Sequence, residues 1–233
     1  MVTIVYDNYE RGEGLRADWG FGCVIEGYER TILFDTGADG NILLDNMRSL
    51  GCHPHKIDVV VLSHSHWDHV GGLEAFLAHN SDVAVYMPGV FSGELKGTVR
   101  SCGAKLIETA DGREVCRHVS ITPVLRGLRD EQALRLEGEE GWTVLTGCAH
   151  PGIVRVLESA RASDSKQIHS CLGGFHMKEK AESAILRTIE QLRQLGVRRA
   201  GPCHCSGDQT RELMRESFGG GSFQAAVGKR IPV

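Results

Sequence analysis

Four side chains of types that bind metal ions lie within one six-residue segment, His64-Ser65-His66-Trp67-Asp68-His69. The segment follows an apolar, β-branched run over 57–62, which predicts a buried strand. Gly71 and Gly72 come next, and a helix is predicted directly after them. The segment is therefore expected to form a loop at the carboxyl end of a strand, where open α/β sheets build their sites.

The spacing within this segment predicts two neighbouring positions for ions. His64 and His66 are two residues apart, so their side chains point the same way if the backbone is extended. Asp68 and His69 follow as the chain turns, so they can face a second position nearby. Imidazole suits zinc, iron and other borderline metals, while a carboxylate adds negative charge and the capacity to transfer protons.

The elements that must position these residues are strands and helices in alternation. Strands are predicted at Val2–Tyr6, Phe21–Glu26, Thr31–Phe34, Ile57–Leu62, Val83–Met87, Lys105–Ile107, Ala133–Glu137, Thr143–Leu145, Gln167–Leu172, Val197–Ala200 and near Phe223–Val227. Helices are predicted at Asn41–Leu50, Leu73–His79, Ile153–Ala160, Glu179–Leu195 and Gln209–Glu216. The helix over 179–195 is the clearest, because its apolar residues form a stripe at helical spacing that Gly196 ends as a C-cap.

The composition is that of a globular protein without a targeting signal. The chain has 233 residues and a formal net charge of −4, which gives no electrostatic indication of nucleic acid binding. No run approaches the roughly 18 apolar residues of a membrane span. The segment Met1–Asp7 lacks the charged and apolar regions of a signal peptide. We therefore expect a cytoplasmic protein whose eight cysteines are reduced thiols, and a single domain over residues 1–233.

The pattern H-x-H-x-D-H followed by two glycines resembles the signature of the metallo-β-lactamase superfamily of metal-dependent hydrolases. The resemblance implies an α/β (α+β) fold, the four-layer αββα sandwich, where the order of elements alone gives only a mixed α/β fold. Three later motifs resemble one branch of that superfamily: Gly-Cys-Ala-His-Pro-Gly, Gly-Gly-Phe-His and Pro-Cys-His-Cys-Ser-Gly. Most members of the branch are labelled metal-dependent hydrolases. It also includes the archaeal 7,8-dihydropterin-6-methyl-4-(β-D-ribofuranosyl)aminobenzene-5′-phosphate synthase.

The resemblance implies that loops after several strands supply the ligands of two divalent ions. The first ion is expected on His64, His66 and His150, and the second on Asp68, His69 and His204. Cys148 competes with His150, because a thiolate is an excellent ligand where it faces the site, but a buried structural thiol is an equal alternative. Zinc suits this nitrogen-rich set best, and iron or manganese also fits.

Other residues near these motifs are expected to support the ions rather than bind them. Asp35 follows a strand and is expected to orient the metal loop, although a plain turn also explains an Asp before Thr-Gly. Cys203 and Cys205 are expected on the face opposite His204 if the backbone is extended. The segment Cys52-His53-Pro54-His55 looks rich in ligands, but it precedes the 57–62 strand and is expected to be a solvated loop far from His64.

Three functions remain open at this point. The first is a hydrolase in which two ions activate a bridging hydroxide for attack on an ester, thioester, lactone or phosphoester. In that hypothesis Asp68 is a ligand and proton acceptor, and His176 is a proton donor or oxyanion partner. The second is a transferase that acts on a pterin-methyl diphosphate, with Arg126, Arg129 and Lys178 as cations in reach. The third is a metal-bound sensor or binding module without catalysis.

The sequence also limits the partners. A small-molecule substrate is expected, with no nucleic acid and no membrane. The residues between Pro88 and Gln132 carry no motif that would identify the substrate. The sequence indicates no oligomeric state.

Overall fold

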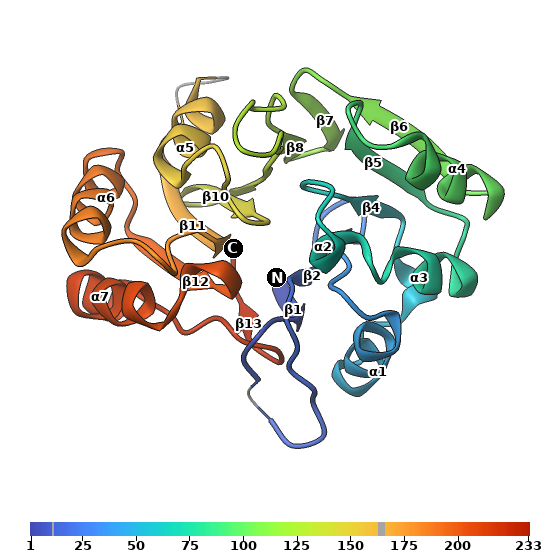
Figure 1. Cartoon of the computed structure of the whole chain (residues 1–233), viewed down its shortest axis with the longest axis horizontal. Helices are drawn as coiled ribbons and strands as arrows, with labels where there is room; N and C mark the ends of the chain where they lie inside the picture. The colour runs from blue at the N-terminus through green and yellow to red at the C-terminus, as the bar shows by residue number, and fades with distance from the viewer. Residues whose placement is uncertain (11, 163–165) are drawn as a thin grey trace.

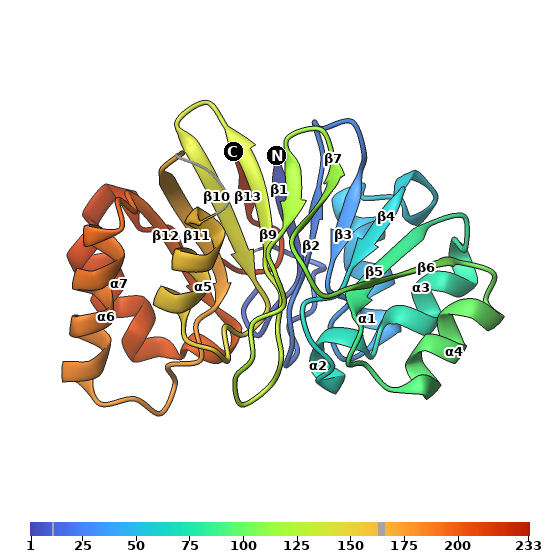
Figure 2. The same ribbon diagram turned by 90° about the horizontal axis from the view of Figure 1, so that it is seen from above.

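Two β-sheets lie face to face, with helices covering the outer face of each (Figure 1, Figure 2). The computed structural model describes residues 1–10, 12–162 and 166–233. The four layers are helices, sheet, sheet and helices, which is the αββα sandwich in the α/β (α+β) class. The fold prediction is therefore confirmed.

The first sheet has seven strands in the order β13-β1-β2-β3-β4-β5-β6. Its strands are β1 (Val2–Tyr6), β2 (Gly22–Ile25), β3 (Ile32–Phe34), β4 (Val59–Val61), β5 (Ala84–Pro88), β6 (Lys105–Thr109) and β13 (Arg230–Ile231). The segments that connect these strands contain α1 (Gly40–Leu50), the 3₁₀ turn Pro54–Lys56, α2 (Trp67–Val70), α3 (Leu73–His79) and α4 (Gly93–Ser101). Figure 2 shows α1, α3 and α4 on the outer face of this sheet.

The second sheet has six strands in the order β12-β11-β10-β9-β8-β7. Its strands are β7 (Arg113–Cys116), β8 (Val119–Ile121), β9 (Leu134–Gly138), β10 (Gly141–Thr146), β11 (Ile168–Gly174) and β12 (Arg199–Cys203). The segments that connect or follow its last strands contain α5 (Ile153–Arg161), α6 (Glu182–Gln194), α7 (Asp208–Phe218) and the 3₁₀ turns His204–Ser206 and Gly219–Gly221. Figure 2 shows α5, α6 and α7 on the outer face of this sheet.

The central strands are buried on both faces. In β3, Ile32 and Phe34 face the core between the sheets, whereas Leu33 faces the helices. In β4 the same alternation sends Val60 towards the helices and its two neighbours towards the other sheet. This double burial explains why the sequence from Val59 to Leu62 is apolar without interruption rather than alternating.

Parallel pairing places the functional loops at one end of the sandwich. In the first sheet β3 to β6 are parallel, and in the second β10, β11 and β12 are parallel. The carboxyl ends of parallel strands lie at the same edge of a sheet, so the loops after β3 and β4 meet there. The loops after β10, β11 and β12 meet in the same way in the second sheet.

Several parts of the chain differ from the sequence prediction. The strand predicted near Phe223–Val227 is wrong, because only isolated bridges occur at Ser222 and Val227 and the last strand is β13. Phe223 instead packs its ring against Gly201, where any side chain would collide with it. The elements α2, α4, β7, β8 and β13 were not predicted, because they are short and α4 contains two glycines that lower helix propensity.

The predicted helix over 179–195 is confirmed as α6. Ile185, Ile189 and Leu192 form its buried face, and Gly196 follows with a φ of 95°. Within the described residues, no helix is both long enough and apolar enough to cross a lipid bilayer.

The core between the sheets predicts a strong dependence of stability on Leu172. This side chain is fully buried, so Leu172→Ala should lower the free energy of unfolding by about 2–5 kcal/mol. Leu186→Ala on α6 is the matched control, because Leu186 is 43% exposed and its loss should change stability by less than about 0.5 kcal/mol. Urea unfolding measures both, and equal losses would contradict the assignment of the core.

Candidate metal centre

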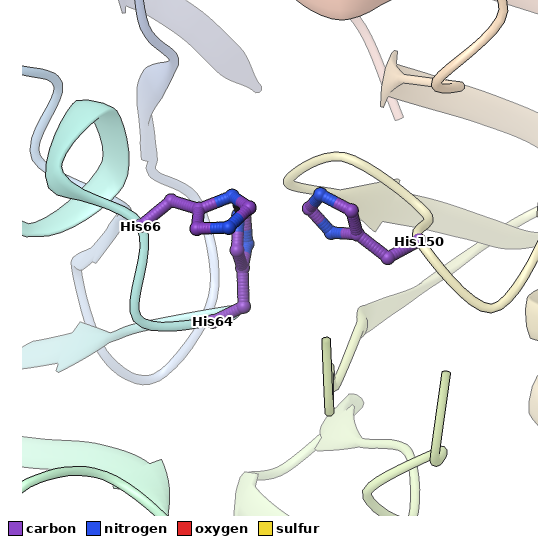
Figure 3. A group of neighbouring side chains, drawn as sticks. All are labelled: His64, His66 and His150. Carbon is purple, nitrogen blue, oxygen red and sulfur yellow. Dashed lines mark hydrogen bonds between the residues drawn. The ribbon is translucent and has the colours of Figure 1, made fainter. Parts of the chain in front are cut away.

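Three histidines from both sheets form the first group of ligand atoms. His64 and His66 follow β4, and Figure 3 shows their rings facing His150, which follows β10. The Nε2 of His64 lies 3.2 Å from the Nδ1 of His66. The ring of His150 lies 4.6 Å and 4.8 Å from those of His64 and His66, between centroids. The three ligating nitrogens lie within 4.8 Å of one another, as one ion requires.

The second group is buried and consists of Asp68, His69 and His204. The short helix α2 turns the chain after His66 and brings Asp68 and His69 to the site. The Nε2 of His204 lies 3.3 Å from the Nε2 of His69 and 3.3 Å from an Asp68 carboxylate oxygen. These are the two groups into which the sequence analysis divided the side chains.

Cys148 lies where the two groups meet. Its Sγ is 3.3 Å from the Nε2 of His69. The same sulfur lies within 4.8 Å of the ligating nitrogen of His64, which belongs to the first group. Cys148 and His150 are therefore not alternatives, because both side chains face the site.

Asp35 holds one histidine of each group in a fixed orientation. Its carboxylate accepts hydrogen bonds from the backbone N–H and the hydroxyl of Ser63, both at 2.7 Å, and contacts the Nδ1 of His69 at 2.8 Å. The Ser63 hydroxyl in turn lies 2.9 Å from the Nδ1 of His64. Burial raises the pKa of Asp35 to about 7. A divalent ion on His69 would favour its ionised form.

Glu131 plays the corresponding part for His150, although no motif in the sequence indicates this role. Its buried carboxylate accepts hydrogen bonds from the backbone N–H groups of Cys148, Ala149 and His150. It also lies 2.8 Å from the Nδ1 of His150. Burial acts to raise the pKa of Glu131, but the neighbouring His64 side chain and the hydrogen bonds from His150 outweigh burial and lower the pKa well below its usual range. Glu131 therefore fixes the loop after β10.

Asn8 is a second residue whose role no motif in the sequence indicates. Its side-chain oxygen lies 3.0 Å from the Nδ1 of His204, and its amide donates to the His204 backbone carbonyl. The backbone N–H of His204 donates to Asp7. The loop after β1 thus positions a histidine that lies almost 200 residues away in the chain.

The chemistry of the donors fits divalent ions. Asp35 occupies the Nδ1 of His69, and Asn8 occupies the Nδ1 of His204. With the proton of each ring on Nδ1, the two Nε2 atoms face each other with lone pairs, beside the Asp68 carboxylate. Burial lowers the pKa of His69 to about 3 and that of His64 well below its usual value, so both rings are neutral, the form that binds metals. A cation between the two Nε2 atoms and the Asp68 carboxylate would remove the electrostatic repulsion between these electron-rich atoms.

A cavity of about 440 Å³ opens beside the two groups. It is lined by Trp19, His176, Lys178, Glu179, Lys180 and Cys205. The ammonium of Lys178 lies 4.8 Å from the centre of the Trp19 ring. The ring of His176 lies 4.6 Å from that of His150, so this residue connects the cavity with the first group. Arg129 reaches the first group by donating a 3.0 Å hydrogen bond to the Nε2 of His66.

Two other expectations from the sequence have different outcomes. The backbone at His204 is not extended but has a φ of 48° and enters a 3₁₀ turn. Cys203 therefore faces the core between the sheets, whereas Cys205 faces the cavity. His53 and His55 are exposed and stack on each other, and neither belongs to a group of ligand atoms among the described residues. Cys52 is instead buried under the helices, so the prediction of a solvated loop is right for the two histidines and wrong for Cys52.

The role of Asp35 can be tested by Asp35→Asn. The amide keeps the shape of the side chain but cannot accept from both Ser63 and His69, so zinc affinity should fall about 10–100-fold. Competition with a chromogenic chelator measures it. Asp45→Asn is the control, since Asp45 pairs with Arg48 on the surface and should leave zinc affinity unchanged. Unchanged affinity in Asp35→Asn would remove the orienting role.

The fold and the site can be compared with known proteins. The family model of the metallo-beta-lactamase superfamily matches residues 23–161. A 7,8-dihydropterin-6-methyl-4-(beta-D-ribofuranosyl)-aminobenzene-5'-phosphate synthase from Methanocaldococcus jannaschii is 28% identical, over 82% of this chain and 81% of that protein. Tm1679, described as a metal-dependent hydrolase of the beta-lactamase superfamily, has a structure with a TM-score of 0.84 and 25% identity, covering 100% of this chain and 98% of that one.

A more distant structure shares the fold alone. YhfI of Bacillus subtilis, a metallo-beta-lactamase fold protein, gives a TM-score of 0.71 at 14% identity, over 98% of this chain and 97% of that one. The match of the family model extends over more than half of the chain and contains the 64–69 segment, Cys148 and His150. The chain belongs to the metallo-β-lactamase superfamily.

Proposed function

We propose that the protein is a metal-dependent hydrolase of a small-molecule substrate, with two divalent ions at the candidate centre. The observation that carries the proposal is the pair of adjacent donor groups, His64, His66 and His150 beside Asp68, His69 and His204. Zinc is the proposed metal, because imidazole nitrogens dominate both groups, and iron or manganese would use the same donors. When bound, such ions act as Lewis acids and make water a stronger nucleophile.

Asp68 is suited to holding an ion. Burial acts to raise its pKa, but the neighbouring side chains of His204 and His69 outweigh burial and lower it. The carboxylate is thus ionised at neutral pH. A weakly basic carboxylate is a better ligand than proton acceptor, so we assign Asp68 to ion binding first and to proton transfer second.

His176 is the proposed partner of the substrate's reacting oxygen. Its side chain lines the cavity and its ring lies beside His150. The hydrogen bond with Cys205 raises the pKa of His176, although burial acts against it. A ring N–H in this position can donate to an oxygen on which negative charge develops.

The cavity favours a substrate with an anionic group and a flat ring. Lys178 and Lys180 line it beside one acidic side chain, Glu179, and Arg129 supplies positive charge at the first donor group. Trp19 offers an aromatic surface close to Lys178. Phosphoesters and carboxylate-bearing esters or lactones that also carry an aromatic or heterocyclic ring combine these features.

The hydrolase proposal predicts a large loss of activity when ions are removed. Chelation or His66→Ala should lower kcat/KM by about a thousandfold or more, because several kcal/mol of electrostatic stabilisation is lost. A screen of esters, thioesters, lactones and phosphodiesters, with zinc, manganese or iron added, identifies the substrate class. The exposed His55→Ala serves as control and should retain full activity. Full metal content and full turnover in His66→Ala would show that the centre is misassigned.

A transferase is the second candidate, and the same cations support it. The Methanocaldococcus jannaschii relative is a synthase with a phosphate-bearing product, which suits Arg129, Lys178 and Lys180. In this alternative the chain would act on a dihydropterin-methyl diphosphate with an aminobenzene riboside phosphate as acceptor. A third candidate, a metal-bound sensor, predicts ion binding without turnover of any substrate.

The two enzymatic candidates differ in their need for an acceptor. A transferase should release diphosphate only when both compounds are present, whereas a hydrolase should turn over its substrate with water and without any acceptor. In either case Lys178→Met should raise KM about tenfold or more, since a charge-assisted contact contributes roughly 1.5–3 kcal/mol. Lys56→Met, at an exposed site in the 3₁₀ turn 54–56, is the control. Absence of diphosphate release under both conditions removes the transferase.

A further inference from the structure

Six of the eight cysteines pack in apolar clusters, and two do not. Cys23, Cys116 and Cys203 face the core between the sheets, while Cys52, Cys102 and Cys171 pack under the helices. Among the described residues, Cys148 and Cys205 belong to none of these three clusters although both are buried. Free cysteines are usually buried as small apolar side chains. The burial of these two thiols outside the apolar clusters therefore needs another explanation.

Both thiols point at the imidazole of His176. The sulfurs of Cys148 and Cys205 and a ring nitrogen of His176 all lie within 4.8 Å of one another. The three residues come from the loops after β10, β12 and β11, which are separate segments of the second sheet. Three donor atoms from three loops thus converge on one point beside the two groups already described.

Backbone hydrogen bonds hold the three loops that carry these donor atoms close together. The N–H groups of Met177 and Lys178 donate to the carbonyl of Cys205 at 3.2 Å, which ties the loop after β11 to the loop after β12. Gly174 donates to Gly147 at 3.1 Å and ties β11 to the loop after β10. A side chain at Gly174 would come within 2.7 Å of the Cys205 sulfur, so glycine is needed there to leave it room.

Three of the residues that carry or adjoin the donors have an unusual backbone conformation, and one of them is His204, next to Cys205, with a φ of 48°. His176 has a φ of 52°, and Ala149, next to Cys148, has a φ of 54°. Residues other than glycine avoid this left-handed region, and where they adopt it the surroundings hold them there, often at ligand sites.

We propose that Cys148, His176 and Cys205 form a third metal site, selective for a soft divalent ion such as zinc. Two thiolates and one imidazole are a ligand set that binds zinc tightly and discriminates against calcium, magnesium and manganese. Three protein ligands leave the fourth tetrahedral position open. Cys205 and His176 line the 440 Å³ cavity, so this position faces the space where a substrate would bind. Cys148 is shared with the second donor group through its 3.3 Å approach to His69.

An ion at this site is compatible with the proposed role of His176 as a hydrogen-bond donor to the reacting oxygen of the substrate. An imidazole that binds an ion through one nitrogen retains an N–H on the other, and it can donate that proton in a hydrogen bond. The third ion does not depend on the proposed hydrolysis, because thiolates bind zinc whatever the reaction is.

Titration of the reduced, metal-free protein with cobalt(II) in the absence of oxygen tests the proposal. Cobalt bound to thiolate gives a near-ultraviolet charge-transfer band, which imidazole and carboxylate ligands do not give. The wild-type protein should bind three equivalents and show this band. Cys205→Ala should bind two equivalents and lose about half of the band, and Cys203→Ala, two residues away and facing the core, should behave as wild type.

His176→Ala is a second test variant in case Cys205→Ala does not fold. His176 is exposed, so its replacement should remove one equivalent of bound cobalt without unfolding the chain. Two equivalents in the wild type, or an unchanged band in Cys205→Ala, would overturn the third site. A disulfide between Cys148 and Cys205 that persists in the reduced protein, detected by mass spectrometry, would overturn it as well. Failure of the two-ion centre has a different signature, since His66→Ala would then leave cobalt binding unchanged.

Discussion

The carboxylate of Asp35 accepts hydrogen bonds from the backbone and side chain of Ser63 and binds the ring of His69, with no exposed surface. These bonds connect the end of β3 to the loop after β4, and they fix two rings, His69 directly and His64 through Ser63. Once the Nδ1 atoms are occupied on this side, the Nε2 atoms must face the interior of the site. One buried acid therefore sets the direction of one ligand atom in each group, while Glu131 and Asn8 orient His150 and His204.

Asp35 also limits how closely the loop after β10 of the second sheet can pack against the first sheet. Gly147, at the end of β10, packs directly on Asp35 and Ser63, and a side chain there would come within 2.1 Å of the Ser63 hydroxyl. Because the position is glycine, the loop after β10 lies against the Asp35–Ser63 pair and brings Cys148 and His150 into reach. The close contact of Gly147 with Ser63 and Asp35 thus fixes the two halves of the site relative to each other, and it leaves no room for a side chain at position 147.

The residues that could be predicted from the sequence are those with a local pattern. The 64–69 segment, His150 and His204 follow predicted strands and carry recognisable motifs, so their convergence at one end of the sandwich followed from the fold. Glu131 and Asn8 have no such pattern. Each is a single polar residue in irregular backbone, and its partner lies on another loop. Only the three-dimensional arrangement shows what these residues do.

Cys205 shows a second limit of sequence reasoning. Its expected direction depended on an extended backbone at His204, and the left-handed φ of that residue turns the side chain towards the cavity instead. Such a conformation in a residue other than glycine is imposed by surrounding contacts, here the bonds from Asn8 and to Asp7. The strand expected near 223–227 failed for a related reason, because packing of Phe223 on Gly201 took the place of strand pairing.

Each of the two donor groups takes two side chains from the loop after β4 and a third from the opposite sheet, namely His150 in one group and His204 in the other. Bound ions would thus be cross-links between the two halves of the sandwich, and neither half alone would hold them tightly. Ion binding and the docking of the sheets then become a single thermodynamic event. At a free ion concentration of about 100 times Kd, one such link would add roughly 2.7 kcal/mol to the free energy of unfolding. Resistance to unfolding would accordingly vary with the supply of metal, even under conditions in which no substrate is present.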